Sequence, residues 1–195
     1  MNSAGLLPDG GVLGVILAGG ASTRMGSDKA LIDVAGRPMI DHVTSALSEV
    51  CSDLVVVGRR GELNGIPCVP DDHPGRLGPA AGVATALRVA DGRAALVVAV
   101  DQPFLRTETL RKLVVEPRTA VPSDQVLQIA CALYSADASQ SISDAVERGL
   151  PLWKAIRDMA RIVEEDEWQR WGEDGRSWFS VDTPEKLDEG LRRFG

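Results

Sequence analysis

The sequence predicts a single-domain α/β fold, a three-layer sandwich in which a mostly parallel sheet lies between helices on both faces. Short apolar runs rich in Val, Leu and Ile alternate along the chain with segments whose apolar residues recur every three or four positions, which is the pattern of strand–helix–strand units. The apolar runs are continuous, as in strands that are buried on both faces. A length of 195 residues is ordinary for one domain. We therefore expect a flexible start over residues 1–10 and one domain over residues 11–195.

The first half of the chain contains three predicted strands and two predicted helices. The first strand, residues 11–18, stops at a pair of glycines. A helix over residues 39–51 starts after a proline and carries an apolar stripe, and a β-branched strand at residues 54–57 follows it. A short strand at residues 66–69 and a helix of small residues at 79–90 repeat the pattern. This order favours parallel pairing.

The alternation continues to residue 134. The wholly apolar run at residues 94–100 is a third strong strand, and it ends abruptly at Asp101. We expect Thr107 to cap a helix that runs to residue 113. Weaker strand patterns follow at residues 119–121 and 126–134.

The last third of the chain predicts a helix, a strand and a final helix. The helix over residues 138–148 is expected to end at Gly149. Residues 178–181 are expected to form a short strand. Thr183 can cap the final helix, and Pro184 suits its first turn.

The composition excludes several classes of function. The formal net charge of −7 argues against a general nucleic-acid binder. The longest apolar stretches, residues 12–18 and 94–100, are far shorter than the ~20 residues of a membrane span, and no basic, apolar signal pattern opens the chain. Cys51, Cys68 and Cys131 are widely spaced, which fits a reducing compartment. We expect a cytoplasmic protein with neither nucleic acid nor membrane as its partner.

The most informative segment is LAGGASTRMGSDKAL, residues 17–31. It follows the first predicted strand, and a glycine-rich loop at the carboxyl end of such a strand can bring backbone N–H groups against a phosphate. Arg24 and Lys29 add two cations to the loop. The spacing of its glycines fits neither a Walker A loop nor G-x-G-x-x-G. The sequence therefore predicts a phosphate site of another kind.

Two aspartates are candidate metal ligands. Asp101 and Asp182 each follow the end of a predicted strand. Magnesium is commonly held by one or two carboxylates together with substrate phosphates, so the two could share one ion if their strands lie in one sheet. A turn or helix cap would use the same residues, and both interpretations remain open at this point.

These segments resemble a known family. The run over residues 17–31 is similar to the signature loop of nucleotidyltransferases with a glycosyltransferase-A-like, Rossmann-like fold, the type found in nucleotide-diphospho-sugar transferases. Its form here is most similar to that of the molybdenum cofactor guanylyltransferases. Three further stretches agree in order, and the resemblance covers about residues 12–192: GPAAG at 78–82, DQP at 101–103 and VDTPE at 181–185.

The resemblance implies a role for specific residues. A guanine nucleotide would meet the backbone at the start of the loop, and its phosphates would face the two loop cations. Asp71 would lie near the nucleoside, and Asp101 with Asp182 would bind Mg²⁺ as the cofactor. The implied nucleotide-binding residues are Leu17, Ala18, Gly19, Gly20, Lys29, Asp71 and Asp101, and the implied catalytic residues are Arg24, Lys29 and Asp101.

The reaction implied is transfer of GMP from GTP to molybdopterin that already carries molybdenum. The terminal phosphate of the molybdopterin accepts the GMP, and pyrophosphate is released. Transient contacts with other proteins of cofactor biosynthesis and with client enzymes are implied as well. Three departures are visible: Gly58 stands where relatives carry Asn, Asp182 stands where many carry Asn, and a His-Pro pair is absent near Leu127.

The departures keep other hypotheses open. A relative could use CTP in place of GTP, or could activate a sugar or alditol phosphate. A non-catalytic, nucleotide-binding partner subunit is a further class, although Lys29 and Asp101 speak against it. A phosphate nucleophile needs no general base, so we expect His42 and His73 to be structural. For Arg59, both contact with the acceptor and a role in solubility remain open.

Overall fold

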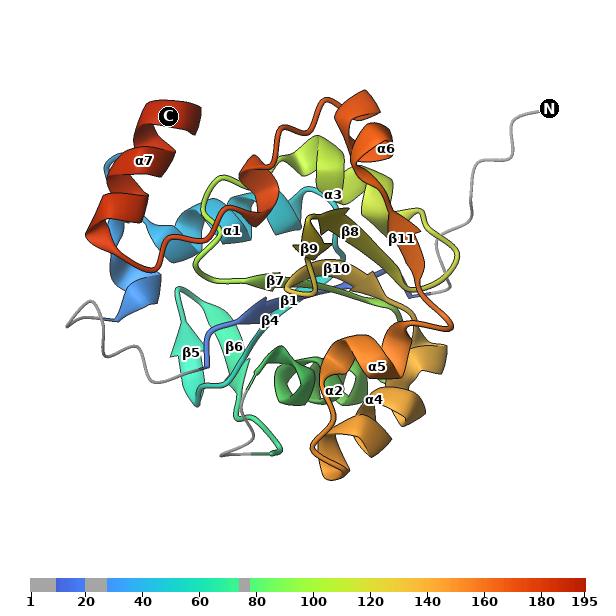
Figure 1. The fold of residues 1–195 in the computed structure, drawn as a ribbon. Coiled ribbons are helices and arrows are strands. Elements are labelled where there is room, and N and C mark those ends of the chain that lie inside the picture. The colour runs from blue at the N-terminus through green and yellow to red at the C-terminus, as the bar shows by residue number, and fades with distance from the viewer. Residues whose placement is uncertain (1–9, 20–27, 74–77) are drawn as a thin grey trace.

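A computed structural model of the protein describes residues 10–19, 28–73 and 78–195. A twisted central sheet of nine strands runs through this part of the chain (Figure 1). In spatial order the main path is β11-β8-β10-β7-β1-β4-β6-β5, and β9 pairs with β8. The strands are β1 (Leu13–Leu17), β4 (Asp53–Val57), β5 (Gly61–Leu63), β6 (Ile66–Val69), β7 (Ala95–Ala99), β8 (Ala120–Asp124), β9 (Val126–Leu127), β10 (Cys131–Tyr134) and β11 (Arg161–Val163).

Helices cover both faces of this sheet. On one face lie α1 (Met39–Ser48), α3 (Thr107–Val114) and α6 (Glu165–Arg170), and on the other lie α2 (Pro79–Ala90), α4 (Ser139–Glu147) and α5 (Leu152–Ile156) (Figure 1). The last helix, α7 (Pro184–Phe194), stands at one end of the molecule beside α1. Short 3₁₀ turns are η1 (Lys29–Leu31), η2 (Ala136–Ala138) and η3 (Arg176–Trp178), and β2 (Asp33–Val34) pairs with β3 (Arg37–Pro38) in a small separate hairpin. The predicted three-layer fold is confirmed.

The core explains why the apolar runs are continuous. In β1, Ile16 packs into the cluster below α1 and α3, whereas Val15 packs into the cluster below α2 and α4. In β7, Val98 and Val97 divide between the same two clusters. A strand between two helical layers therefore needs apolar side chains at every position.

Strands β7, β1, β4 and β6 are adjacent and parallel, and their registers bring their carboxyl ends to the same level. Strand β11 also pairs in parallel with β8. Leu17 is opposite both Val57 and Ala99. Beyond β7 the sheet changes direction, since β10 is antiparallel to both β7 and β8. The described helices include none that is long and apolar enough to cross a bilayer.

Two sequence-based expectations about strands were wrong. Residues 178–181 form no strand, because Trp178 ends η3 and donates its indole N–H to Asp124 Oδ2 at 2.9 Å, while Val181 N donates to Asp101 O at 2.8 Å. The expected strand 126–134 is two strands: Gln125 has φ +58° and turns the chain from β8 back into β9, and a further turn precedes β10.

The helix caps were predicted with mixed success. Thr183 accepts a hydrogen bond from Lys186 N at 3.2 Å and caps α7 as expected. Thr107 does not cap α3, because it is the first residue inside the helix and its hydroxyl makes no capping bond. The preceding amide, Arg106 N, instead donates to Ser177 Oγ at 2.9 Å. The sequence patterns had not indicated β5, β11, α5 and α6, and the expected flexible start lies outside the described residues except for Gly10.

Candidate functional site

The carboxyl ends of β7, β1, β4 and β6 form one edge of the sheet, and the candidate site lies there. Ala18 N donates to Val57 O at 2.9 Å, and Val100 N donates to Leu17 O at 3.0 Å. The chain therefore leaves all of these strands at the same level. Ligands of open α/β sheets bind beyond this edge.

An ion pair joins two of the predicted site residues across this edge. Lys29 Nζ lies 3.1 Å from Asp101 Oδ2, and the two side chains are 19% and 21% exposed. Lys29 starts η1, which Asp28 caps by accepting from Ala30 N at 3.1 Å. Asp101 follows β7 in a turn that the buried Gln102 closes, because its Oε1 accepts from Ala99 N at 3.1 Å. Both charges are thus held by local structure.

Two glycines bring the turns after β1 and β4 into backbone contact. Gly58 has φ +100°, and a Cβ atom there would lie 2.4 Å from the Cα of Gly19. A Cβ on Gly19 would lie 3.0 Å from the Cα of Gly58. Neither position accepts a side chain without moving backbone, which explains physically why position 58 is glycine in this chain.

Helix α2 begins at the same edge. Gly78 has φ +97° at the N-cap, and Pro79 opens the helix. A Cβ on Gly82 would lie 2.9 Å from Leu17 Cδ2, so the first turn of α2 packs closely on the end of β1. The two glycines and the proline of the GPAAG segment thus bring a helix N-terminus close to the end of β1, where the protein backbone is predicted to contact the nucleotide.

Asp71 lies beyond the end of β6, on the other side of β1 from Asp101. Its Oδ1 accepts from His73 N at 2.9 Å and from Thr85 Oγ1 at 3.5 Å. Thr85 is fully buried in α2 and also accepts from Asp72 N at 3.1 Å. The turn after β6 is therefore fixed to α2, and His73 contributes only its backbone N–H to these bonds.

Asp182 comes close to Asp101 through the backbone, because the preceding residue, Val181, bonds to Asp101 O. Its side chain lines a cavity of about 390 Å³ together with Asp124, Lys186 and Arg193, and Asp101 does not line that cavity. The described part of the chain contains no group of three or more His, Cys, Asp or Glu side chains that could enclose a metal.

The donor set nevertheless fits Mg²⁺, which usually takes one or two carboxylates and completes its shell with phosphate and water. Asp101 offers a partly exposed carboxylate whose second oxygen has no hydrogen bond among the described residues. Two of the predicted site residues, Gly20 and Arg24, lie outside the described residues.

Arg59 is a site residue that the sequence patterns did not assign. Its Nε donates to Ala18 O at 3.1 Å, and both of its terminal nitrogens donate to the carboxylate of Asp28. These hydrogen bonds hold the pKa of Asp28 below its usual range. The only sequence signal was an arginine directly after a strand and a glycine, which is too common to carry an assignment.

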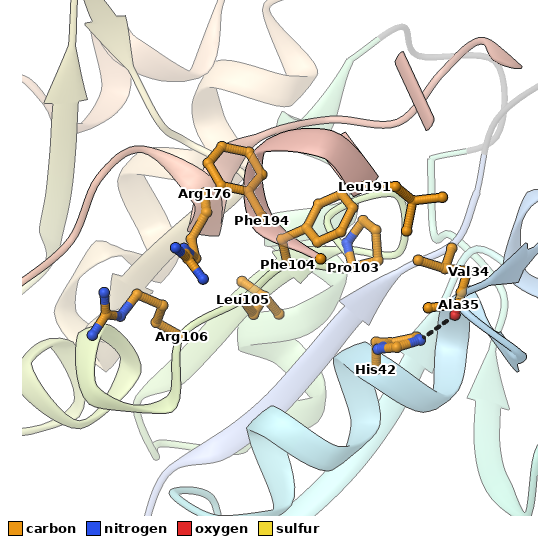
Figure 2. A pocket seen from close by; sticks show the side chains of 11 residues that line it. Val34, Ala35, His42, Pro103, Phe104, Leu105, Arg106, Arg176, Leu191 and Phe194 are labelled. Carbon is orange, nitrogen blue, oxygen red and sulfur yellow. Dashed lines mark hydrogen bonds between the residues drawn. The ribbon is translucent and has the colours of Figure 1, made fainter. Parts of the chain in front are cut away.

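A second cavity, of about 260 Å³, lies between α1, α7 and the turn after β7 (Figure 2). It is lined by His42, Phe104, Arg106 and Arg176 among others, and it contains neither Lys29 nor Asp101. His42 Nε2 lies 2.8 Å from Val34 O, which agrees with a structural role for this histidine (Figure 2).

Comparison with known proteins identifies relatives along most of the chain. A family model described as a MobA-like NTP transferase domain matches residues 14–165. A probable molybdenum cofactor guanylyltransferase from Pelotomaculum thermopropionicum is 33% identical over 185 residues, covering 89% of each chain. Another from Natronomonas pharaonis is also 33% identical and covers 93% of this chain and 97% of its own.

Solved structures share the fold. Molybdopterin-guanine dinucleotide biosynthesis protein A from Archaeoglobus fulgidus superposes with a TM-score of 0.76 at 22% identity, covering 93% of this chain and 97% of its own. The 2-C-methyl-D-erythritol 4-phosphate cytidylyltransferase from Thermus thermophilus gives 0.67 at 16% identity, with 93% and 98% covered. At these identities the likeness concerns the fold alone.

Proposed function

The chain belongs to the family of MobA-like NTP transferase domains and is a nucleotidyltransferase, and we propose that it transfers GMP from GTP to the terminal phosphate of molybdopterin. The observation that carries the proposal is the ion pair of Lys29 with Asp101, 3.1 Å apart beside the end of β1. The substrate assignment comes from the relatives, which are named molybdenum cofactor guanylyltransferases. The product is a guanine dinucleotide form of the cofactor, and pyrophosphate is released.

Catalysis of this transfer requires the protein to position the two reactants and to neutralise their negative charge. An oxygen of the acceptor phosphate attacks the α-phosphorus of GTP, and the bond from that phosphorus to the β-phosphate oxygen breaks. A phosphate monoester has its second pKa at about 6, so the nucleophile is already ionised at neutral pH and no side chain must remove a proton. Both reactants are anions, and neutralising them in one place is the main task of the site.

Lys29 and Asp101 divide this task. In the structure each neutralises the other. When GTP enters, Lys29 turns its charge to the phosphates and stabilises the negative charge that builds up in transfer. Arg24, in the same loop, is proposed to act with it. Asp101 would hold Mg²⁺, and Asp182, whose neighbour Val181 bonds to the Asp101 carbonyl, is proposed as the second ligand; the ion when bound would neutralise phosphate oxygens.

The backbone at the end of β1 would receive the nucleotide. Ala18 and Gly19 carry no long side chain, and Gly58 lies against them without one. A ligand can therefore approach the backbone closely. Asp71, fixed to α2 through Thr85, is proposed to lie near the nucleoside. We place the reaction in the cytoplasm, with transient contacts to proteins that supply molybdopterin or receive the product.

One observation favours keeping a second candidate function, the transfer of CMP from CTP to the same acceptor. Gly58 has no side chain, and the contact with Gly19 prevents any replacement from adding one cheaply. A side-chain contact with the base from this position is therefore absent, whichever base is bound.

Nucleotide binding and turnover test the proposal together. In the presence of Mg²⁺, calorimetry and thermal shift should show that GTP binds more tightly than CTP and ATP, and pyrophosphate should be released only when molybdopterin is added. Asp101→Asn should lose the part of the thermal shift that depends on Mg²⁺, whereas Asp188→Asn, on the exposed side of α7, should keep it. Tighter binding of CTP would move the assignment to the cytidylyl reaction, and GTP turnover by Asp101→Asn at the normal rate would remove Asp101 from the site.

A further inference from the structure

We propose that Arg59 is a positioning residue for the nucleotide site: its guanidinium fastens the end of β1 to the start of η1 and so sets Lys29 opposite Asp101. The inference rests on the proposed function in one respect, since it assumes that Lys29 meets a nucleotide phosphate. It goes beyond the proposed function because it assigns a role to a side chain that follows β4 and lies outside both the loop at residues 17–31 and the GPAAG segment at residues 78–82.

The contacts of Arg59 run to both sides of the glycine-rich loop. On one side its Nε bonds to Ala18 O at 3.1 Å, directly after β1. On the other side both terminal nitrogens bond to the carboxylate of Asp28. The same carboxylate caps η1 through Ala30 N at 3.1 Å, and η1 begins with Lys29. One planar group therefore connects the backbone that would receive the nucleotide with the turn that presents the lysine.

The arrangement needs an arginine. Only a guanidinium offers donors in a fixed fork that can reach a carboxylate with two nitrogens and a carbonyl with a third. A lysine at position 59 keeps the charge but supplies a single ammonium group on a flexible stem. The two roles, charge and geometry, can thus be separated by substitution.

Global stability is a poor explanation for the cluster. The Arg59 and Asp28 side chains are 26% and 33% exposed, and pairs of this exposure contribute little to the folded state. What the cluster does accomplish is local, because it fixes the relative position of β1, β4 and η1 next to the Lys29–Asp101 pair.

The chain contains a matched control at the opposite edge of the sheet. Arg93 is also 26% exposed, and its guanidinium joins a carboxylate to backbone carbonyls. Nη1 lies 2.7 Å from Asp53 Oδ2 and 3.4 Å from Gly10 O, and Nε lies 3.2 Å from Ala90 O. Asp53 begins β4, so this cluster resembles that of Arg59 in chemistry and exposure but lies away from the site.

The first experiment measures the local effect without any nucleotide. Hydrogen exchange should be followed in the peptide that covers residues 29–34, where the amides of Ala30, Leu31 and Ile32 are bonded to Asp28 or Lys29. We expect Arg59→Ala to speed exchange of these amides about tenfold through local opening, while Arg93→Ala leaves them at the wild-type rate. Equal exchange in the two variants would overturn the inference.

The second experiment measures the site itself, with whichever nucleoside triphosphate the wild-type protein binds most tightly. Arg59→Ala should weaken its binding, and kcat/KM where turnover is seen, by about 10- to 100-fold, because a site displaced by an ångström loses that much. Arg59→Lys should recover less than a third of the loss, and Arg93→Ala should match the wild type. Full recovery by lysine would show that charge alone matters and would contradict a positioning role.

A double-mutant cycle with Lys29→Ala completes the test. If Arg59 acts through Lys29, the double variant should lose hardly more than Lys29→Ala alone, whereas independent effects would multiply. Multiplying losses would refute the inference. The outcomes remain distinct from those of the proposed function: preference for another nucleotide would refute guanylyl transfer and leave the comparison of Arg59 with Arg93 intact.

Discussion

Lys29 and Asp101 are separated by 72 positions in the chain and lie 3.1 Å apart in the structure. Each was predicted from its own surroundings, one from a glycine-rich loop after a strand and the other from a carboxylate after a strand. Parallel strands bring the segments that follow them to one edge, and η1 together with the turn after β7 then places the two side chains in contact. Arg59 was not assignable in the same way. Its partners Ala18 and Asp28 lie on the two sides of the glycine-rich loop, in a different segment of the sequence from Arg59. Only the close packing of Gly58 on Gly19 brings these partners within hydrogen-bond distance of the guanidinium.

At the residue scale, Lys29→Ala should reduce kcat with GTP and molybdopterin by about 100- to 1,000-fold, the range found when a preorganised charge is removed from a transition state. The fold should survive, because Lys29 is partly exposed and its loss leaves Asp101 at an edge open to solvent. Steady-state kinetics and circular dichroism measure the two effects.

Lys112→Ala is the matched control, because this lysine lies exposed on α3 away from the edge. It should keep the wild-type rate. Turnover by Lys29→Ala within threefold of the wild type would remove Lys29 from the phosphate site.

Helix α7 shows what element-scale patterns can and cannot predict. Its start was predictable, because Thr183 and Pro184 are local signals and Thr183 does cap the helix. Its docking was not, because it depends on the three phenylalanines of the chain, Phe104, Phe179 and Phe194, which come from three separate segments. Their ring centroids lie 5.4 to 6.1 Å apart. The same cluster explains why residues 178–181 form no strand, since that segment connects η3 to α7 across the turn after β7.

At the element scale, Gly190→Ala should destabilise the docking of α7. In an exposed helix this change stabilises by about 1 kcal/mol. Here a Cβ would lie 2.3 Å from Phe104 Cε2 and 3.1 Å from Phe179 Cε1, so the aromatic cluster must shift. We expect a net loss of about 1–3 kcal/mol in the free energy of unfolding, measured by urea denaturation.

Asp188→Ala, on the exposed side of the same helix, serves as the control and should change stability by less than about 0.5 kcal/mol. If Gly190→Ala proves as stable as the wild type or more so, the packing of α7 on Phe104 is not what holds the helix.

The whole molecule carries a net charge of −7 and yet is proposed to bind two polyanions. A negative net charge is unfavourable for binding the phosphate backbone of nucleic acid, but it says little about a small phosphate, because one crevice can have its own charge balance. The sequence predicted the layers, since burial on both faces of β1 and β7 requires continuous apolar runs. It could not predict the antiparallel far side of the sheet, where β8, β9 and β10 are set by turns such as that at Gln125.

Burial of thiols leads to a prediction about the stability of the whole fold. Burial raises the pKa of Cys51 from its usual 9.0 to about 12, and it raises the pKa of the fully buried Cys131 as well. A folded-state pKa above the unfolded one means that the unfolded chain loses protons first as the pH rises. The contribution to stability is therefore fully present below about pH 9 and is lost progressively above it.

Urea denaturation at a series of pH values should thus show a midpoint that falls steadily from pH 9 to pH 11, with these thiols contributing no slope between pH 7 and pH 8. Cys51→Ala removes one of the two thiols from the linkage, so the denaturation midpoint of this variant should fall less steeply over the alkaline range. Cys68→Ala serves as the comparison, because this thiol is less buried and its pKa is raised less. The slope reports the difference in protons bound by the unfolded and folded chains, so it separates linkage from a simple loss of packing, which would lower the midpoint equally at every pH. An alkaline slope that Cys51→Ala leaves unchanged would mean that Cys51 ionises as readily in the folded protein as in the unfolded chain, and that solvent reaches this part of the core.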